Sequence, residues 1–274
     1  MWWAGRVTGP AVLDPVALLA TYDRQLRAYQ PPTQPEGVTV ERDGPLLRVL
    51  GYGNGGFLTY VDLGGLAGDE MDALIARQRE IFTRRGEPVE WKLHGHDEPA
   101  DLADRLVAAG FVAEDRETVV VGPVAALAAA VPVLPDGVRL REVSARADLD
   151  RIAAMESAVW SEDRGWLADG LAKEVAADPA SITVVAAEAG DEVVSAGWIR
   201  YVPGTAFGTL WGGSTLPDWR RRGIYRALVA YRARLAQARG FTLLQVDASD
   251  NSRPILQRLG FVALTTTTPY VYTP

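Results

Sequence analysis

The chain has 274 residues, enough for two domains of ordinary size or for one large domain with a sizeable core. Its formal net charge of −7 argues against a surface built to bind nucleic acid or anionic lipid. There is no cysteine, which excludes disulfides, thiolate zinc sites and a cysteine nucleophile, and a catalytic triad would need His94 or His96. No apolar stretch is long enough to span a membrane and no signal peptide is recognisable, so we expect a cytoplasmic protein.

The first half of the chain predicts strands, followed by a helix-strand-helix unit that closes on Gly110 and Phe111. The expected elements are a helix over 15–29, strands over 37–41, 46–50 and 57–63, a helix over 72–86, a strand over 88–95 and a helix over 100–110.

A linker is expected between the two halves. The segment from Val121 to Asp136 is rich in alanine and is then broken by Pro132 and Pro135. We interpret it as the end of a strand that continues into a linker, with a boundary near residue 133. The chain is therefore divided into a domain of residues 1–133 and a domain of residues 134–274.

The second half repeats the order of the first and closes on Gly260 and Phe261. In both halves a helix ending in glycine precedes an apolar strand, a polar loop and a short helix; each terminal glycine would adopt a left-handed conformation. The expected elements are strands over 137–143, 181–188, 192–202 and 207–215, helices over 145–159 and 166–177, and a unit of helix 227–240, strand 241–248 and helix 253–259. We therefore predict an α/β (α+β) fold of two related units, each a mixed, mostly antiparallel sheet flanked by helices.

The sharpest local feature is a run of three arginines before a glycine at a helix start. Arg220, Arg221 and Arg222 precede Gly223, and an amphipathic helix follows. A helix N-terminus offers free N–H groups, a glycine lets an anion approach the main chain, and guanidinium groups add charge. This combination favours a phosphate-bearing ligand, whereas the charge run alone would equally suit a solvated helix start.

The spacing from Arg220 through Gly223 to Tyr225 resembles the R/Q-x-x-G-x-G/A motif of the GNAT superfamily of N-acetyltransferases, which cradles the pyrophosphate of acetyl-CoA. The strands on either side and the closing Leu259, Gly260 and Phe261 also match, so the resemblance covers about residues 137–273. Tyr225 departs from the usual Gly or Ala, and its side chain must point away from the phosphates. The first half then looks like a degenerate GNAT-like unit, because the corresponding helix start near Asp72 is acidic and has no such motif.

The resemblance implies acetyl-CoA as co-substrate, no metal, and a set of contacts in which strand backbone holds the pantetheine arm. The implied residues are Gly213, Ser214, Thr215, Arg220, Arg221, Arg222, Gly223, Ile224, Tyr225 and Arg226. Trp160 and Trp166 flank a polar loop at the place where this fold admits substrate, and they are candidates for the acceptor pocket, with the core as the alternative.

The general base and acid are harder to place. The position of the family's usual tyrosine acid is Leu256 here, so the acid would be Ser252, Tyr270 or Tyr272, each of which also suits a structural role. Asp247 ends a strand and is a candidate base, although a loop-capping role suits it equally. Glu156 is a weaker candidate for the base.

Two further motifs are interpreted as structural. The glycines from Gly51 to Gly56 satisfy G-x-G-x-x-G, but a strand follows them rather than a helix, so we predict a hairpin turn. His94 and His96 lack a third nearby ligand, so we predict structural or surface roles rather than a metal site.

We therefore expect an acyltransferase that moves an acetyl group from acetyl-CoA directly to a primary amine. The alternatives are an inactive CoA-binding module and a tandem acetyltransferase of the mycothiol-synthase kind. The expected partner is a small-molecule or peptide amine, with no nucleic acid and no membrane, and the protein is expected to be a monomer or homodimer.

Overall fold

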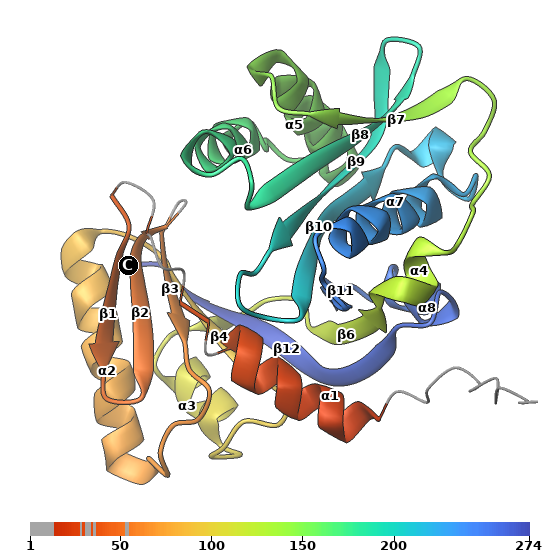
Figure 1. Cartoon of the computed structure of the whole chain (residues 1–274). Coiled ribbons are helices and arrows are strands. Elements are labelled where there is room, and N and C mark those ends of the chain that lie inside the picture. Colours follow the sequence, from red (N-terminus) through yellow and green to blue (C-terminus); the bar gives the residue numbers. More distant parts are fainter. Residues whose placement is uncertain (1–13, 28, 31–33, 35–36, 53–54) are drawn as a thin grey trace, which may run out of the picture.

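The computed structural model describes residues 14–27, 29–30, 34, 37–52 and 55–274. In these residues twelve strands form one mixed sheet, and helices cover both of its faces (Figure 1). The strand order is β1-β2-β3-β4-β12-β6-β11-β10-β9-β8-β7, and β5 pairs with β12 beside this path. The prediction of a mixed, mostly antiparallel α/β fold is confirmed.

The elements of the first half follow the predicted order. They are α1 (Pro15–Tyr22) with a π-helical turn η1 (Asp23–Arg27), β1 (Thr39–Asp43), β2 (Leu46–Tyr52), β3 (Gly55–Thr59), α2 (Gly68–Arg85), β4 (Val89–His94), α3 (Leu102–Ala108), β5 (Val112–Ala113), β6 (Glu117–Pro123) and α4 (Val124–Ala128).

The elements of the second half lie within one or two residues of most predicted bounds. They are β7 (Val138–Val143), α5 (Arg146–Trp160), α6 (Trp166–Ala177), β8 (Ile182–Ala189), β9 (Glu192–Tyr201), β10 (Phe207–Thr215), the 3-10 turn η2 (Pro217–Trp219), α7 (Ile224–Ala238), β11 (Leu243–Ala248), α8 (Arg253–Arg258) and β12 (Val262–Tyr272).

The two halves exchange their last long strands. β6 of the first half pairs antiparallel with β11 of the second, and β12 of the second half pairs antiparallel with β4 of the first. β6 and β12 also pair with each other at the centre of the sheet. Each final strand therefore pairs with the other half of the chain, and the two units share one continuous sheet.

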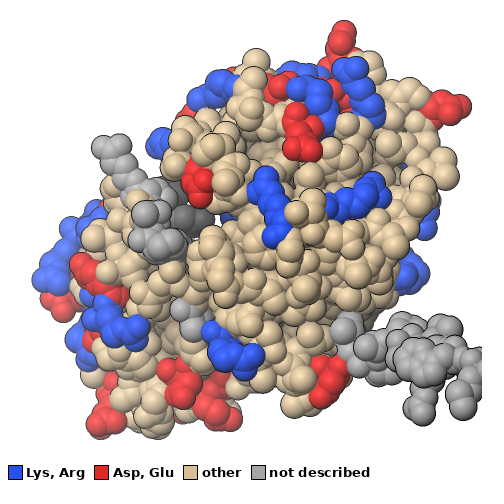
Figure 2. All heavy atoms as spheres, in the orientation of Figure 1, with Lys and Arg blue, Asp and Glu red and all other residues tan. Residues whose placement is uncertain are grey.

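Apolar clusters on both faces hold the sheet. α2 and α3 pack on the first half around Met71, Phe82 and Trp91, while α7 packs on β9 and β10 around Leu228 and Ala233. α5 and α6 cover the opposite face of the second half, and α1 packs on that same face of β12. On the side shown in Figure 2, acidic and basic residues are interspersed around a largely uncharged centre.

The expected helix ends and the expected hairpin are observed. Gly86, Gly110, Gly240 and Gly260 have φ values of 65°, 87°, 83° and 99°, the left-handed conformation that terminates each helix. Tyr52 pairs with Gly55 across the glycine-rich segment, so this motif spans a hairpin; residues 53 and 54 lie outside the described part of the chain. None of the helices in the described ranges is long and apolar enough to cross a membrane.

Candidate active site

The start of α7 exposes main chain beside an arginine-rich loop. Gly223 is the N-cap of α7 with φ 87°, and a Cβ at this position would lie 3.1 Å from the carbonyl oxygen of Val133. Arg221 has φ 63°, a left-handed conformation that costs free energy for a residue with a Cβ. The first N–H groups of α7 have no partner inside the helix and carry the positive end of its dipole. The loop therefore has a strained backbone, and it lies at a helix N-terminus that is suited to bind an anion.

A cavity of about 610 Å³ lies against this helix start. Arg221, Arg222 and Arg226 line it together with residues 130–133 of the linker. Arg220 is held back from the cavity, because its Nε donates a hydrogen bond of 2.9 Å to the carbonyl oxygen of Thr215. Three guanidinium groups and a helix N-terminus around one cavity favour a phosphate-bearing ligand.

The sheet opens between β10 and β11. These parallel strands pair only from Phe207 to Thr209, and both continue beyond the last pair without pairing to each other. β10 also carries a bulge between Gly212 and Ser214, where its register against β9 shifts. The opening exposes backbone of β10 to a ligand.

A buried arginine supports the bulge from the α7 side. Arg232 is 1% exposed, and its Nη1 donates to the carbonyl oxygens of Trp198 at 3.1 Å and of Trp211 at 3.0 Å. Burial lowers the pKa of Arg232 to about 10. The side chain therefore satisfies two carbonyl groups at the point where the strand departs from regular pairing.

Tyr225 lies on the first turn of α7 and packs against β10. A Cβ added to Gly213 would lie 2.7 Å from Cε2 of Tyr225, so the ring lies directly on the backbone of the bulge. Burial raises the pKa of the Tyr225 hydroxyl. The side chain of Tyr225, which is larger than the usual Gly or Ala of the motif, therefore packs against β10.

Glu156 of α5 meets the bulge from the opposite face. The residue is 2% exposed, and its Oε2 accepts hydrogen bonds from Ser214 Oγ at 2.7 Å and from Trp160 Nε1 at 3.0 Å. Its Oε1 is buried and has no hydrogen-bond partner among the described residues. Burial raises the pKa of this carboxyl group. A buried carboxylate with one free oxygen beside an open strand is suited to accept a proton.

The family of this region follows from a comparison with known protein families. Residues 148–261 match the model of the acetyltransferase (GNAT) family. These residues form a GNAT domain. The domain includes β10, which borders the opening, α7, which starts at the arginine-rich loop, and the closing helix α8. The chain is an acyltransferase, as the sequence predicts.

Solved structures share the fold over nearly the whole chain. A GCN5-related N-acetyltransferase from Kribbella flavida is 18% identical with a TM-score of 0.64, covering 95% of this chain and 96% of its own. A tandem GNAT protein from the clavulanic acid biosynthesis pathway is 13% identical with a TM-score of 0.60, covering 94% of this chain and 93% of its own. A GCN5-related N-acetyltransferase from Sphaerobacter thermophilus is 15% identical with a TM-score of 0.56, covering 94% and 91%. No curated protein matches the sequence.

The candidate base Asp247 lies at the opening, but it is engaged with the other half. Asp247 lies near the end of β11, on the face of the sheet that α5 covers in the GNAT domain. Its Oδ2 lies 2.5 Å from Nζ of Lys92 on β4. Gln245 Nε2 donates to its Oδ1 at 2.7 Å.

The other two catalytic candidates lie in different surroundings. Ser252 precedes α8 and interacts with Ser249, with an Oγ to Oγ distance of 3.3 Å. Tyr270 is 8% exposed and belongs to the apolar cluster of the first half, on β12 opposite Trp91. Tyr272 likewise lies in the first half, where its hydroxyl is 2.9 Å from Thr83 Oγ1.

The two candidate acceptor residues are both largely exposed. Trp160 is 53% exposed and also donates to Ser214 Oγ at 3.0 Å, which places its indole beside Glu156. Trp166 begins α6 and is 52% exposed. Trp211 on β10 is 46% exposed, although its sequence position favours the core, and it lies on the face of the sheet that α5 covers.

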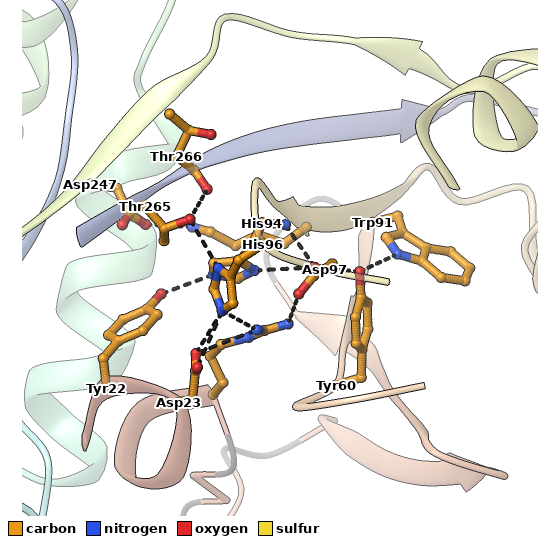
Figure 3. Close-up of polar contacts among 12 residues, drawn as sticks. Tyr22, Asp23, Tyr60, Trp91, His94, His96, Asp97, Asp247, Thr265 and Thr266 are labelled. Atoms are coloured by element: carbon orange, nitrogen blue, oxygen red, sulfur yellow. Dashed lines mark hydrogen bonds and ion pairs between the residues drawn. The ribbon is translucent and has the colours of Figure 1, made fainter. Parts of the chain in front are cut away.

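The two histidines join a hydrogen-bond network between η1, β4 and β12 (Figure 3). His94 is 4% exposed with Nε2 3.0 Å from the hydroxyl of Tyr22, and His96 Nδ1 lies 2.9 Å from Thr265 Oγ1. Burial lowers the pKa of His94. Within the described ranges no group of three or more His, Cys, Asp or Glu residues is arranged to hold a metal ion.

The sequence offers a signal for Glu156 that a motif search misses. Leu149, Ile152 and Ala153 form the buried stripe of α5, and Glu156 follows them at helical spacing on that stripe. A carboxylate at a position that the periodicity reserves for an apolar side chain is a candidate functional group.

Proposed function

We propose that the GNAT domain transfers an acetyl group from acetyl-CoA directly to a primary amine of a small molecule or peptide. The observation that carries the proposal is the contact of the buried Glu156 with Ser214 of β10 beside the opening between β10 and β11, together with the arginine-lined cavity at the start of α7. The likeness of this region to the acetyltransferase family model supports it.

The residues present fit a pyrophosphate at α7 but not at the corresponding helix of the first half. At α7 a Cβ on Gly223 would contact the linker carbonyl, and three arginines line the cavity. At α2 the first turn carries Asp69 and Glu70, whose charge repels phosphate. We therefore place one acetyl-CoA site in the chain, held by the backbone of residues 213–215 and by Arg220 through Arg226.

Acetyl-CoA supplies a thioester as the acyl donor when it is bound. Glu156 Oε1 accepts the proton that the attacking amine loses as its nitrogen forms the new bond to the acetyl carbon. The carbon–sulfur bond breaks and the thiolate takes up a proton, so one proton in total passes from amine to thiol. Ser214 and Trp160 hold Oε2 in place, which leaves Oε1 as the proton acceptor.

Asp247 and Ser252 stay candidates for the remaining proton transfer, because Asp247 lies near the end of β11 and Ser252 lies in the loop that joins β11 to α8. Tyr270 is a weaker candidate, since its ring is packed in the first half. Trp160 and Trp166 are proposed to line the acceptor pocket, because both are exposed at the loop between α5 and α6.

The experiment titrates acetyl-CoA into the wild-type chain, Gly223→Asp and the control Gly204→Asp by calorimetry. Both glycines have positive φ, 87° and 74°, so both substitutions carry the same kind of backbone strain. Gly223→Asp should weaken binding at least tenfold, or about 1.4 kcal/mol, and Gly204→Asp should bind like the wild type. Equal binding by all three chains contradicts the proposal.

Turnover separates this function from a CoA-binding module without activity. Because the chain has no cysteine, a thiol-reactive dye reports only the CoA thiol that the reaction releases. Acetyl-CoA binding without thiol release over a panel of primary amines supports the inactive module. A cysteinyl-glycoside acceptor carries a thiol of its own, so with that acceptor the N-acetylated product is measured by mass spectrometry; product with this acceptor alone supports a mycothiol-synthase activity.

A further inference from the structure

The exchanged strands place polar side chains of the first half next to the opening of the GNAT domain. Lys92 and Glu90 alternate on β4, Glu117 begins β6 and Asp247 ends β11. The strand registers put all four on one face of the sheet, the face that α5 covers further along. We call these four residues the seam cluster.

The seam cluster has three carboxyl groups and one ammonium group. Lys92 pairs with Asp247 at 2.5 Å, and the side chains of this pair are 18% and 17% exposed. Glu90 and Glu117 are partly exposed, so the cluster reaches solvent. Burial and then the charge of Asp247 raise the pKa of Glu117 to about 7. Two carboxyl groups of the cluster are therefore not paired with Lys92, and an ammonium group that binds beside them would favour their ionised form.

A buried hydroxyl without a partner adjoins this cluster. Thr267 of β12 is 0% exposed, and its Oγ1 has no hydrogen-bond partner among the described residues. Thr267 pairs with Glu117 across β12 and β6, so the two side chains are neighbours on the same face. An unsatisfied buried hydroxyl is costly, so this one marks an incomplete polar network beside Glu117.

An exposed indole connects the cluster with the reacting centre. Thr209 of β10 and Gln245 of β11 form the last pair, and two residues further along the strands Trp211 and Asp247 lie on the same face, on either side of the opening. Ser214, which holds Glu156, lies roughly 7–10 Å further along β10 at about 3.3 Å per residue. An alkyl chain of that length would lie along the 46% exposed Trp211.

We propose that the seam cluster binds a second ammonium group of the acceptor, so that the preferred substrate is a diamine or polyamine whose far charge lies on Glu117, Glu90 and Asp247. This proposal rests on the proposed function, since it assigns the reacting amine to Glu156. It also gives the first half a direct role, because β4 and β6 supply three of the four cluster residues.

The test is calorimetric titration of diaminohexane and of aminohexane into the protein saturated with CoA. The diamine should bind at least tenfold more tightly than the monoamine, a difference of about 1.4 kcal/mol. Glu117→Gln and, separately, Glu90→Gln should reduce that ratio severalfold. The control Glu70→Gln, an exposed acidic residue of α2, removes the same charge and should keep the wild-type ratio.

Equal affinity for the two amines in the wild type, or no binding of either, overturns the proposal. So does a ratio that neither Glu117→Gln nor Glu90→Gln changes. The CoA titration that precedes each amine titration shows whether the variant is folded. Failure of the wild type to bind CoA refutes the acetyl-CoA site. CoA binding without selectivity for the diamine refutes only the ammonium site at the seam cluster.

Discussion

The ammonium group of Lys92 on β4 lies 2.5 Å from the carboxylate of Asp247 on β11, and this ion pair joins the two halves across their exchanged strands. Neither strand is paired to the other, since β12 and β6 lie between them. The contact is therefore a product of the strand exchange and depends on the register of four strands.

Removing one partner of this pair should destabilise the whole chain. Lys92→Met or Asp247→Asn leaves a partly buried charge unpaired, at a cost of about 1–3 kcal/mol, between the values for surface and buried pairs. Urea unfolding of the single variants and of the double variant measures the coupling free energy. We expect a coupling of about 1 kcal/mol or more, and strictly additive effects contradict the role given to the pair.

Arg232→Met should destabilise the GNAT domain by about 2–4 kcal/mol, because the carbonyl groups of Trp198 and Trp211 lose their buried donor. The matched control is Arg234→Met, on the exposed side of the same helix. Urea midpoints of the two variants give the comparison. If Arg232→Met loses no more stability than Arg234→Met, the bulge does not need this arginine.

Glu156→Gln should lower kcat at least a hundredfold while acetyl-CoA affinity is kept, since the amide cannot accept the proton. The control Glu192→Gln changes an exposed glutamate at the start of β9 and should have little effect. Thiol release at saturating amine measures kcat, and calorimetry measures affinity. Retained kcat in Glu156→Gln would remove this residue from the mechanism.

The pH profile of the reaction should follow the same carboxyl group. Because burial raises the pKa of Glu156, kcat should rise with pH through a midpoint above the ordinary glutamate value of 4.5. Ser214→Ala removes a hydrogen bond that stabilises the ionised form, so it should move this midpoint upward. An unshifted midpoint in Ser214→Ala would mean that another group controls the acidic limb.

Glu117 should make the stability of the chain depend on pH. Its folded-state pKa of about 7 exceeds the ordinary value of 4.5, so the folded state binds more protons between these values. The stability is therefore fully present below about pH 4.5 and falls as the pH rises through about 7. Glu117→Gln should remove this loss, and urea midpoints of both chains at intervals between pH 5 and about 8 should diverge with rising pH. Parallel pH dependence in the two chains would contradict the raised pKa.

The sequence predicts most elements because their signals are local. The bounds of α6 and β10 agree with the predicted bounds, since a turn or a glycine marks each end, and Gly223 marks the start of α7. The exchange of β6 and β12 has no local signal, because each strand is equally apolar whichever half it pairs with. Pairing between strands far apart in sequence is decided by tertiary contacts.

The difference between local and long-range contacts also explains why one part of the candidate site is visible in the sequence and the other is not. The arginines and Gly223 form one contiguous segment, so their spacing is visible in the sequence. Glu156 and Ser214 are 58 residues apart, and their contact arises only when α5 packs on β10. Tyr270 suited a catalytic role by residue type, but the alternation of β12 turns its ring into the core of the first half.

A crystal structure with bound acetyl-CoA tests the central claim most directly. We expect the pyrophosphate at the main chain of Arg221 to Ile224, the pantetheine arm between β10 and β11, and the thioester within reach of Glu156. A pyrophosphate bound away from the start of α7, or a thioester on the side of the sheet remote from Glu156, would contradict the account.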